Sequence, residues 1–317
     1  DLILFGTGVM FIEADDINDI RFSTRHISEC YVSEDENGRV DTVFRRFKMT
    51  AQACVNKFEK VSEKIQRIAE RDPYEEVMIA HAVYPRDQRD TMSKAVANMA
   101  FASCYFDEDA KIIMQESGFN EFPYCVPRWL KSSFELGYGR SCGMSSLSDV
   151  KMLNKFSEIT IRAAQKQVDP PLMVPDDGFM APIRTVPGGL NFYRSGTRDR
   201  IEPLNIGANN PLGLAMEEQR RQAIRSAFYV DQLITGQGPT MTATEVIQRT
   251  EEKMRLLGPV LGRLQAELLQ PLIKRVYNLL SLRRQLPETP DFMQGSDIEI
   301  EYVSPLAQAQ KHGDVQS

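Results

Sequence analysis

The sequence predicts an α+β fold for a chain of 317 residues. Short apolar, β-prone runs between turn residues dominate residues 1 to about 130. From Leu147 onwards, apolar residues recur at steps of three and four, which is the period of an amphipathic helix. A Pro- and Gly-rich segment, residues 170–212, separates two such helical stretches. Together these patterns predict a β-rich part followed by a helical hairpin that carries an insert.

The β-rich part is predicted to contain strands and two short helices. Asn37-Gly38 is a strong hairpin turn signal between two of the strands. The helices are expected at about 50–58 and 62–70, the second capped by Ser62. The expected strands are Val9–Glu13, Cys30–Ser33, Val40–Lys48, Tyr74–Tyr84, Ala100–Phe106 and Lys111–Gln115.

The first long helix is predicted to begin near Ser146 or Ser148, either of which can cap it. Pro170-Pro171 ends it, because neither proline donates a backbone N–H and each restricts the residue before it. Such a helix is roughly 33 Å long at about 1.5 Å per residue. Its apolar positions include Leu147, Val150, Leu153, Phe156, Ile159 and Ala163.

Further elements are predicted after this helix. The insert has room for short strands at Leu172–Val174, Ile183–Val186 and Leu190–Tyr193, and a final strand is expected at Ile298–Val303. A second helix covers about Leu214–Ile234. Thr242-Ala-Thr-Glu245 is a capping box that opens a long helix to about Gln285. Gly258-Pro259 and Gln270-Pro271 are expected to kink that helix.

Composition narrows the classes of function. The net charge of −6 lacks the basic signature of a nucleic-acid-binding chain. Five scattered cysteines without C-x-x-C spacing indicate packed, reduced thiols rather than a zinc site. No apolar run approaches the roughly 20 residues that span a bilayer. The first residue is not Met and precedes an apolar run directly, so we expect a fragment of a longer protein.

One glycine-rich segment superficially matches a phosphate-binding loop. Gly137-Tyr-Gly139-Arg-Ser-Cys-Gly143 precedes the first long helix. It lacks a Walker lysine, and no following acidic residue completes a dinucleotide fingerprint. The segment is therefore interpreted as a flexible entry to the helix. A nucleotide-binding enzyme using residues 137–143 is retained as an alternative.

Candidates for catalysis are few. His81 lies in an alternating strand and is interpreted as a half-buried strand histidine, although a pair with Cys104 stays open. The carboxylates at Asp15-Asp16, Asp107–Asp109 and Asp176-Asp177 sit in turn-like sequence, where Asp bonds to the backbone. We therefore predict no catalytic residue, no cofactor and no metal site.

A stripe of basic residues lies along the two predicted helices. Such a stripe is usually a solvated face, and nucleic-acid contact is the competing interpretation. On the first helix the spacing places the cations on one face. The stripe comprises Lys151, Lys155, Arg162, Lys166, Arg220, Arg221 and Arg225.

Several motifs occur in a familiar order. Residues 138–155 are followed by Arg162-Ala-Ala-Gln165, residues 168–178, Met241-Thr-Ala-Thr-Glu-Val246 and Tyr302-Val-Ser-Pro-Leu-Ala307. Together they cover most of residues 137–310, and they resemble the portal, or head-to-tail connector, proteins of short-tailed podoviruses. Residues 1–136 are compatible with this family but less distinctive.

The resemblance implies a portal fold: a β-rich wing, a two-helix stem, a β-containing clip and a long kinked wing helix. Its layout assigns residues 1–144 to an N-terminally truncated wing, 145–169 and 212–234 to the stem helices, and 170–211 to the clip. Residues 235–241 become the tunnel loop, 242–303 the wing helix and strand, and 304–317 the start of a truncated crown.

The resemblance also implies a structural role without enzymatic activity. Family members form homo-oligomeric rings, usually dodecameric, at the virion's portal vertex, and these assemble in the host cytoplasm. Double-stranded DNA passes through the channel during packaging and ejection. The implied partners are the terminase packaging motor, tail adaptor proteins, and capsid and scaffolding proteins, with no membrane. A non-portal ring adaptor is a further alternative.

The family layout also implies roles for individual residues. The implied tunnel loop contains Gly236, Gln237, Gly238, Pro239, Thr240 and Met241. The implied clip docking residues are Asp176, Asp177 and Gly178. The basic stripe is expected either to guide the DNA backbone or to pair with carboxylates of a neighbouring subunit.

Overall fold

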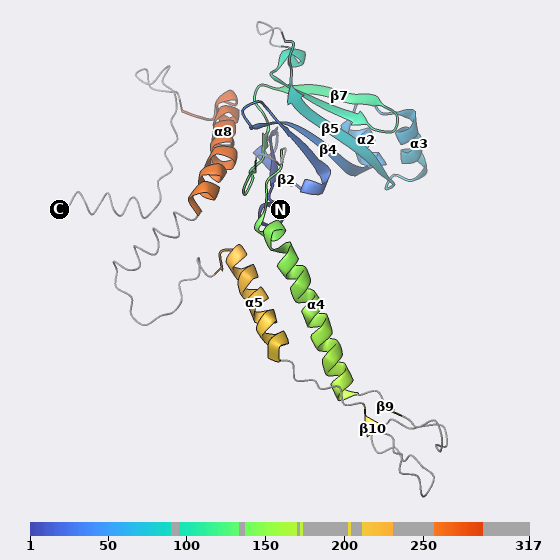
Figure 1. Cartoon of the computed structure of the whole chain (residues 1–317). Helices are drawn as coiled ribbons and strands as arrows, with labels where there is room; N and C mark the ends of the chain where they lie inside the picture. The colour runs from blue at the N-terminus through green and yellow to red at the C-terminus, as the bar shows by residue number, and fades with distance from the viewer. Residues whose placement is uncertain are drawn as a thin grey trace, which may run out of the picture. The chain divides into compact units, whose positions relative to one another are not determined.

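The fold is α+β, as predicted. The computed structural model describes residues 1–89, 95–132, 137–169, 172–173, 202–203, 211–230 and 257–287 (Figure 1). The chain divides into two compact units, one formed by residues 1–144 with 240–317 and the other by residues 145–239. Each unit is described by itself.

The first unit is built on a five-stranded antiparallel sheet in the order β3-β4-β5-β6-β7. Strands adjacent in this sheet follow one another in the sequence, so the sheet is a meander. The hairpin turn is confirmed: Asp35 Oδ1 accepts from the amides of Asn37 and Arg39, and Gly38 has φ +75°. The five predicted strands that form this sheet are confirmed, as β3 (Cys30–Glu34), β4 (Val40–Thr50), β5 (Glu76–Pro85), β6 (Phe101–Asp107) and β7 (Ile112–Phe119).

A second sheet contains β2 (Asp19–Arg25), β1 (Val9–Asp15) and β8 (Tyr124–Cys125). Alternate residues of β1 enter different cores. Val9 and Phe11 pack in the same cluster as Val43 of the large sheet, whereas Ile12 packs with Leu279. The small sheet therefore lies between the large sheet and a carboxyl-terminal helix.

Two short helices cover another part of the large sheet. The helices α2 (Ala51–Lys57) and α3 (Glu63–Arg71) are capped by the side chains of Thr50 and Ser62, as predicted for Ser62. Their apolar residues form a core with Phe47 and Ile79 of the sheet. The remaining short pieces of this unit are α1 (Leu2–Phe5) and the 3-10 turns η1 (Ile27–Glu29) and η2 (Val96–Asn98).

The carboxyl-terminal helical region runs without a break through residues 257–282. Residues 257–264 are α-helical, η3 (Gln265–Leu269) is a π-helical turn, and α8 covers Gln270–Leu282. The irregularity predicted at Gln270-Pro271 is therefore a π turn. Pro271 explains it, because in an α-helix its ring would clash with the carbonyl of Glu267. The kink predicted at Gly258-Pro259 borders residues outside the described part.

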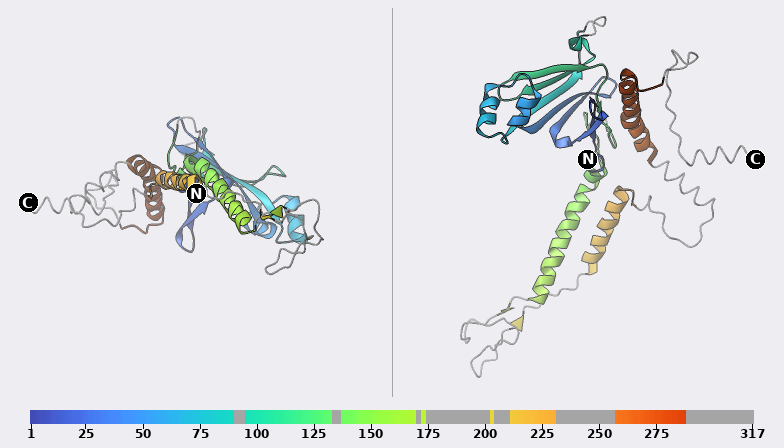
Figure 2. Two further views of the ribbon diagram at one scale, coloured as in Figure 1. Left: turned by 60° about the horizontal axis from the view of Figure 1, so that its bottom comes forward. Right: turned by 180° about the vertical axis from the view of Figure 1, so that it is seen from behind.

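The second unit contains most of α4 (Cys142–Val168), with α5 (Pro211–Ala227) beside it (Figures 1 and 2). The first long helix is thus confirmed, but its predicted cap was wrong: Ser141 Oγ accepts from the amide of Met144. The second helix ends at Ala227 rather than Ile234, and Tyr229 follows with φ +58°.

The insert is described at two short strands only. β9 (Leu172–Met173) pairs antiparallel with β10 (Glu202–Pro203), which confirms part of the first predicted strand there. The other predictions between 174 and 201, and those at 231–256 and 288–317, lie outside the described residues. These include the tunnel-loop residues, the capping box, the clip residues Asp176–Gly178 and the strand at 298–303.

Candidate functional site: the helical hairpin and the root of its first helix

Two polar contacts join the helices of the hairpin. Arg220 Nη1 lies 2.9 Å from Asp149 Oδ1, and the Thr160 hydroxyl donates to Glu217 Oε1 at 2.8 Å. Glu217 is only 6% exposed. No sequence pattern marks Glu217, because a lone Glu among surface charges gives no signal of burial.

The basic stripe is largely paired within the chain. Glu158 Oε2 lies 2.9 Å from Lys155 Nζ, and its Oε1 lies 2.7 Å from Arg162 Nη2. Arg221 pairs with Glu217 and Glu218 at 3.4 and 3.6 Å. These ion pairs, with that of Arg220, reduce the positive field of the stripe. Three members make no ion pair within the described parts of α4 and α5, namely Lys151, Lys166 and Arg225.

Much of the apolar surface of α4 remains exposed. Val150, Leu153 and Phe156 are half-buried, as the predicted helical period requires. Ile159 and Ile161, by contrast, are 52% and 59% exposed. The two helices therefore do not bury all of their apolar side chains against each other.

The glycine-rich segment at the root of α4 is packed against the amino-terminal residues. A Cβ on Gly139 would lie 2.3 Å from the carbonyl oxygen of Gly6, and one on Gly6 would lie 2.2 Å from that of Gly139. The Gly139 amide donates to Thr7 Oγ1 at 2.8 Å, and the Gly137 amide donates to Glu34 Oε1 at 3.1 Å. The segment is neither a flexible entry nor an open phosphate cradle, since these donors are occupied.

Arg128 is buried near the root of α4 and contacts several segments of the chain. It is 2% exposed, and its guanidinium bonds to Glu34, to the carbonyl of Gly38 and to both carboxylate oxygens of Glu267. Lys131 also pairs with Glu34. Arg128 thus ties the β3–β4 hairpin, the chain leading to α4 and the π turn together. No sequence motif pointed to it.

A comparison with protein families matches all of residues 1–317 to the bacteriophage head to tail connecting protein family. The chain belongs to this family. It is 35% identical to the portal protein of Salmonella phage epsilon15, over 97% of this chain and 57% of that protein. It is 34% identical to the probable portal protein of Bordetella phage BPP-1, over 98% of this chain and 58% of that protein. The chain therefore spans somewhat over half the length of these relatives.

A third relative is less similar and is covered over a shorter stretch. The portal protein of Enterobacteria phage T3 is 23% identical over 70% of this chain and 47% of its own length. The resemblance found in the sequence motifs is confirmed by these matches.

The catalytic pair considered for His81 is not formed in this connecting protein. His81 lies opposite Tyr105 in the β5–β6 register, whereas Cys104 lies opposite Ala82 on the other face. His81 is also fully rather than half buried, at 2% exposure. Its Nε2 lies 2.9 Å from Ser103 Oγ, and its ring stacks on Tyr105 at 3.9 Å. It is a core histidine.

Asp107, one of the clustered carboxylates in turn-like sequence, bonds to the backbone of its own turn, as predicted. Asp107 is buried: its Oδ2 accepts from the Ser62 hydroxyl, and its Oδ1 accepts from the amides of Asp109 and Ala110. The described residues hold no cluster of three or more potential metal ligands. All five cysteines are buried and free. Among the described helices, none has the length and apolar character needed to cross a membrane.

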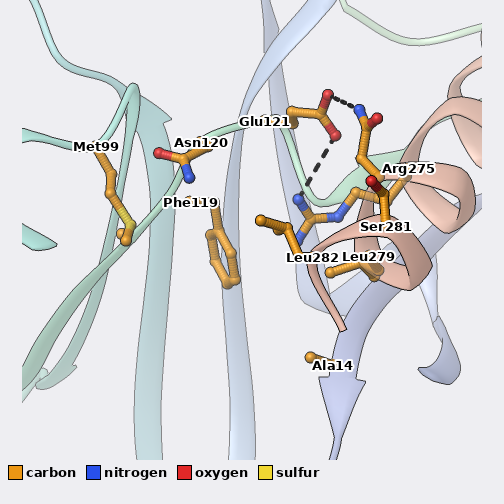
Figure 3. Close-up of a pocket in the computed structure, with 11 residues that line it drawn as sticks. Ala14, Met99, Phe119, Asn120, Glu121, Arg275, Leu279, Ser281 and Leu282 are labelled. Carbon is orange, nitrogen blue, oxygen red and sulfur yellow. Dashed lines mark hydrogen bonds and ion pairs between the residues drawn. The ribbon is translucent and has the colours of Figure 1, made fainter. Parts of the chain in front are cut away.

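A pocket of about 450 Å³ lies between the end of β7 and α8 (Figure 3). Glu121 accepts from the Asn278 amide there and pairs with Arg275 Nη1 at 3.9 Å. The Arg275 guanidinium also lies over the ring of Phe119, 5.4 Å from its centroid. These contacts attach α8 to the sheet, and we assign the pocket no ligand.

Proposed function

We propose that this chain is the wing and stem portion of a portal subunit, which forms a ring around a channel for double-stranded DNA. The observation that carries the proposal is the α4–α5 hairpin, whose isoleucines at 159 and 161 are more than half exposed. Neighbouring copies in a ring would cover such residues. The relatives named as portal proteins support the same role.

In this proposal the protein acts through its shape and its charge, and it makes or breaks no covalent bond. Each phosphate that a protein neutralises adds affinity through counterion release, so a DNA channel should hold few free cations. The internal pairing of Lys155, Arg162, Arg220 and Arg221 fits this requirement. Lys151, Lys166 and Arg225 are left to guide the DNA backbone or to contact a neighbouring subunit.

The remaining roles follow the family layout. Residues 235–241 are proposed to constrict the channel, and Asp176–Gly178 to lie at the docking site of the packaging motor and later of the tail. The ring is proposed to be a dodecamer in the virion, contacting capsid and scaffolding proteins after assembly in the host cytoplasm. Deleting residues 176–195 should abolish motor docking, and retained docking would contradict the clip assignment.

The experiment for the hairpin measures the mass of the assembled full-length protein. Ile159→Glu with Ile161→Glu should shift the population from rings to monomers, because each carboxylate would have to be buried between subunits. Gln165→Glu with Gln167→Glu adds the same charge at exposed polar positions of α4 and should leave rings intact. Equal assembly of both variants would contradict the proposed contact.

A further inference from the structure

Four cations gather beside the core of the large sheet, and we call them the basic cluster. They are Arg21 and Arg25 of β2, Arg45 of β4 and Lys57 at the end of α2. These elements belong to the first unit (Figure 1). The cluster is separate from the stripe on the helical hairpin.

The stacked rings of His81 and Tyr105 connect the members of the basic cluster. Lys57 Nζ lies 4.7 Å from the centroid of the Tyr105 ring, and Arg45 lies opposite His81 in the β4–β5 register. Phe11 links Arg25 to these rings, because the centroid of the Phe11 ring lies 5.9 Å from that of His81 and 5.8 Å from the Arg25 guanidinium carbon. Three cations therefore surround one ring stack.

Most of the basic cluster lacks a counter-ion. Arg45 pairs with Glu29 at 2.9 Å. Across the described ranges of the chain, Arg21, Arg25 and Lys57 make no ion pair, although Glu13 lies opposite Arg21 in the β1–β2 register. Arg25 Nε is buried and has no hydrogen-bond partner. Three of the four cations therefore have no neutralising partner within the described ranges of the chain.

The concentration of positive charge affects the pKa values of Lys57 and His81. Partial burial lowers the pKa of Lys57, and Arg25, Arg45 and Arg21 lower it further against an opposing effect of Glu13. The pKa of His81 is lowered to about 3 by burial, with Lys57, Arg45 and Arg25 adding to the effect. An anion bound among these cations would relieve their mutual repulsion.

We propose that the basic cluster is a docking site for an acidic peptide segment of a partner protein. Carboxylates of such a segment can form ion pairs with Arg21, Arg25 and Lys57, which make none within the described ranges of the chain. A peptide fits better than a nucleic acid, because the rings of Phe11, Phe47 and Phe58 are buried and offer no face for base stacking.

The test measures binding of a fluorescent hexaglutamate peptide to the full-length protein by anisotropy at low salt. The double variant Arg25→Gln with Lys57→Gln should bind about tenfold or more weakly, since about 1.4 kcal/mol corresponds to a factor of ten. Lys57→Gln alone changes an exposed residue and should give a smaller loss in the same direction. Lys48→Gln with Arg67→Gln removes two exposed cations elsewhere and should bind like the wild type.

Three outcomes would overturn the proposal. Equal weakening in the Lys48→Gln, Arg67→Gln control would show a diffuse charge effect. Displacement of the peptide by millimolar inorganic phosphate would show a small-anion site. Tighter binding of a DNA duplex than of the peptide, lost in the Arg25→Gln, Lys57→Gln variant, would show a nucleic-acid site. The proposal is independent of the portal role, because it concerns residues outside the hairpin.

Discussion

Arg128 and Glu267, separated by 139 positions in the chain, form a bidentate ion pair. Nη2 of Arg128 lies 2.5 Å from Oε1 of Glu267, and Nε lies 3.2 Å from Oε2. The backbone amide of Arg128 also donates to Glu267 at 2.9 Å. These three bonds join the π turn to the chain that leads to α4, and all of them lie within the first unit.

The first prediction concerns this ion pair. Arg128→Met should destabilise the first unit by about 3–5 kcal/mol, because it leaves Glu34 and Glu267 without their main buried counter-ion. Arg67→Met removes an exposed cation that pairs with the exposed Glu63 and should change stability by about 0.5 kcal/mol or less. Urea unfolding followed by tryptophan fluorescence provides the comparison. Similar midpoints for both variants would show that Arg128 does not hold these elements together.

The second prediction concerns the close approach of Gly6 and Gly139. Gly139→Ala should cost about 1–3 kcal/mol, because its Cβ would overlap the Gly6 carbonyl and the Arg128 side chain. Gly262→Ala is the matched control in the helical residues 257–264, where the added Cβ would meet no atom of another described segment within 4 Å. That change should stabilise by about 0.5–1 kcal/mol. Thermal melting of both variants tests the opposite signs, and a neutral Gly139→Ala would contradict the tight packing.

The third prediction concerns pH. Burial, with Lys57, Arg45 and Arg25, lowers the pKa of His81 to about 3, against 6.5 for a free side chain. Between these values the unfolded chain binds a proton at this position and the folded chain does not. The contribution of His81 to stability is thus fully present above pH 6.5 and is lost as pH falls towards 3, by up to about 1.4 kcal/mol per pH unit.

The variant His81→Gln isolates this contribution. Its free energy of unfolding should fall less steeply than that of the wild type between pH 6 and pH 4, as measured by urea unfolding at several pH values. His26→Gln changes an exposed histidine and serves as the control for the loss of a histidine side chain. Parallel slopes for wild type and His81→Gln would contradict the assignment.

The fourth prediction concerns the bond between Thr160 and Glu217. Thr160→Val keeps the shape but removes the donor, so the buried Glu217 carboxylate loses a partner at a cost of about 1–3 kcal/mol. Thr160→Ser retains the hydroxyl and should lose much less. Hydrogen exchange of the α5 amides reports the difference, and equal protection in both variants would show that this bond does not join the helices.

Local patterns in the sequence predicted most of the regular structure. The strands from β3 to β7 and the cap at Ser62 follow from period-two alternation and capping chemistry, both of which act over a few residues. β2 was not predicted, because Ile20 and Phe22 are its only large apolar residues and its charges mask the alternation. The predicted cap of α4 was wrong because four serines lie near its start (Ser141, Ser145, Ser146 and Ser148), and only tertiary packing selects Ser141.

The functional contacts were harder to predict than the fold. Arg128 and Glu267 meet only after the chain folds, so no short motif marks them. Gly139 was interpreted as part of a flexible entry to the helix, and its contact with Gly6 is visible only in three dimensions. The basic stripe was identified, but the acidic residues that neutralise half of it lie one helical turn away or on the facing helix.

Negative-stain electron microscopy of the full-length protein tests the portal role most directly. The account predicts rings with a central hole, in which neighbouring hairpins cover Ile159 and Ile161. A population of compact monomers in place of rings would contradict the portal role.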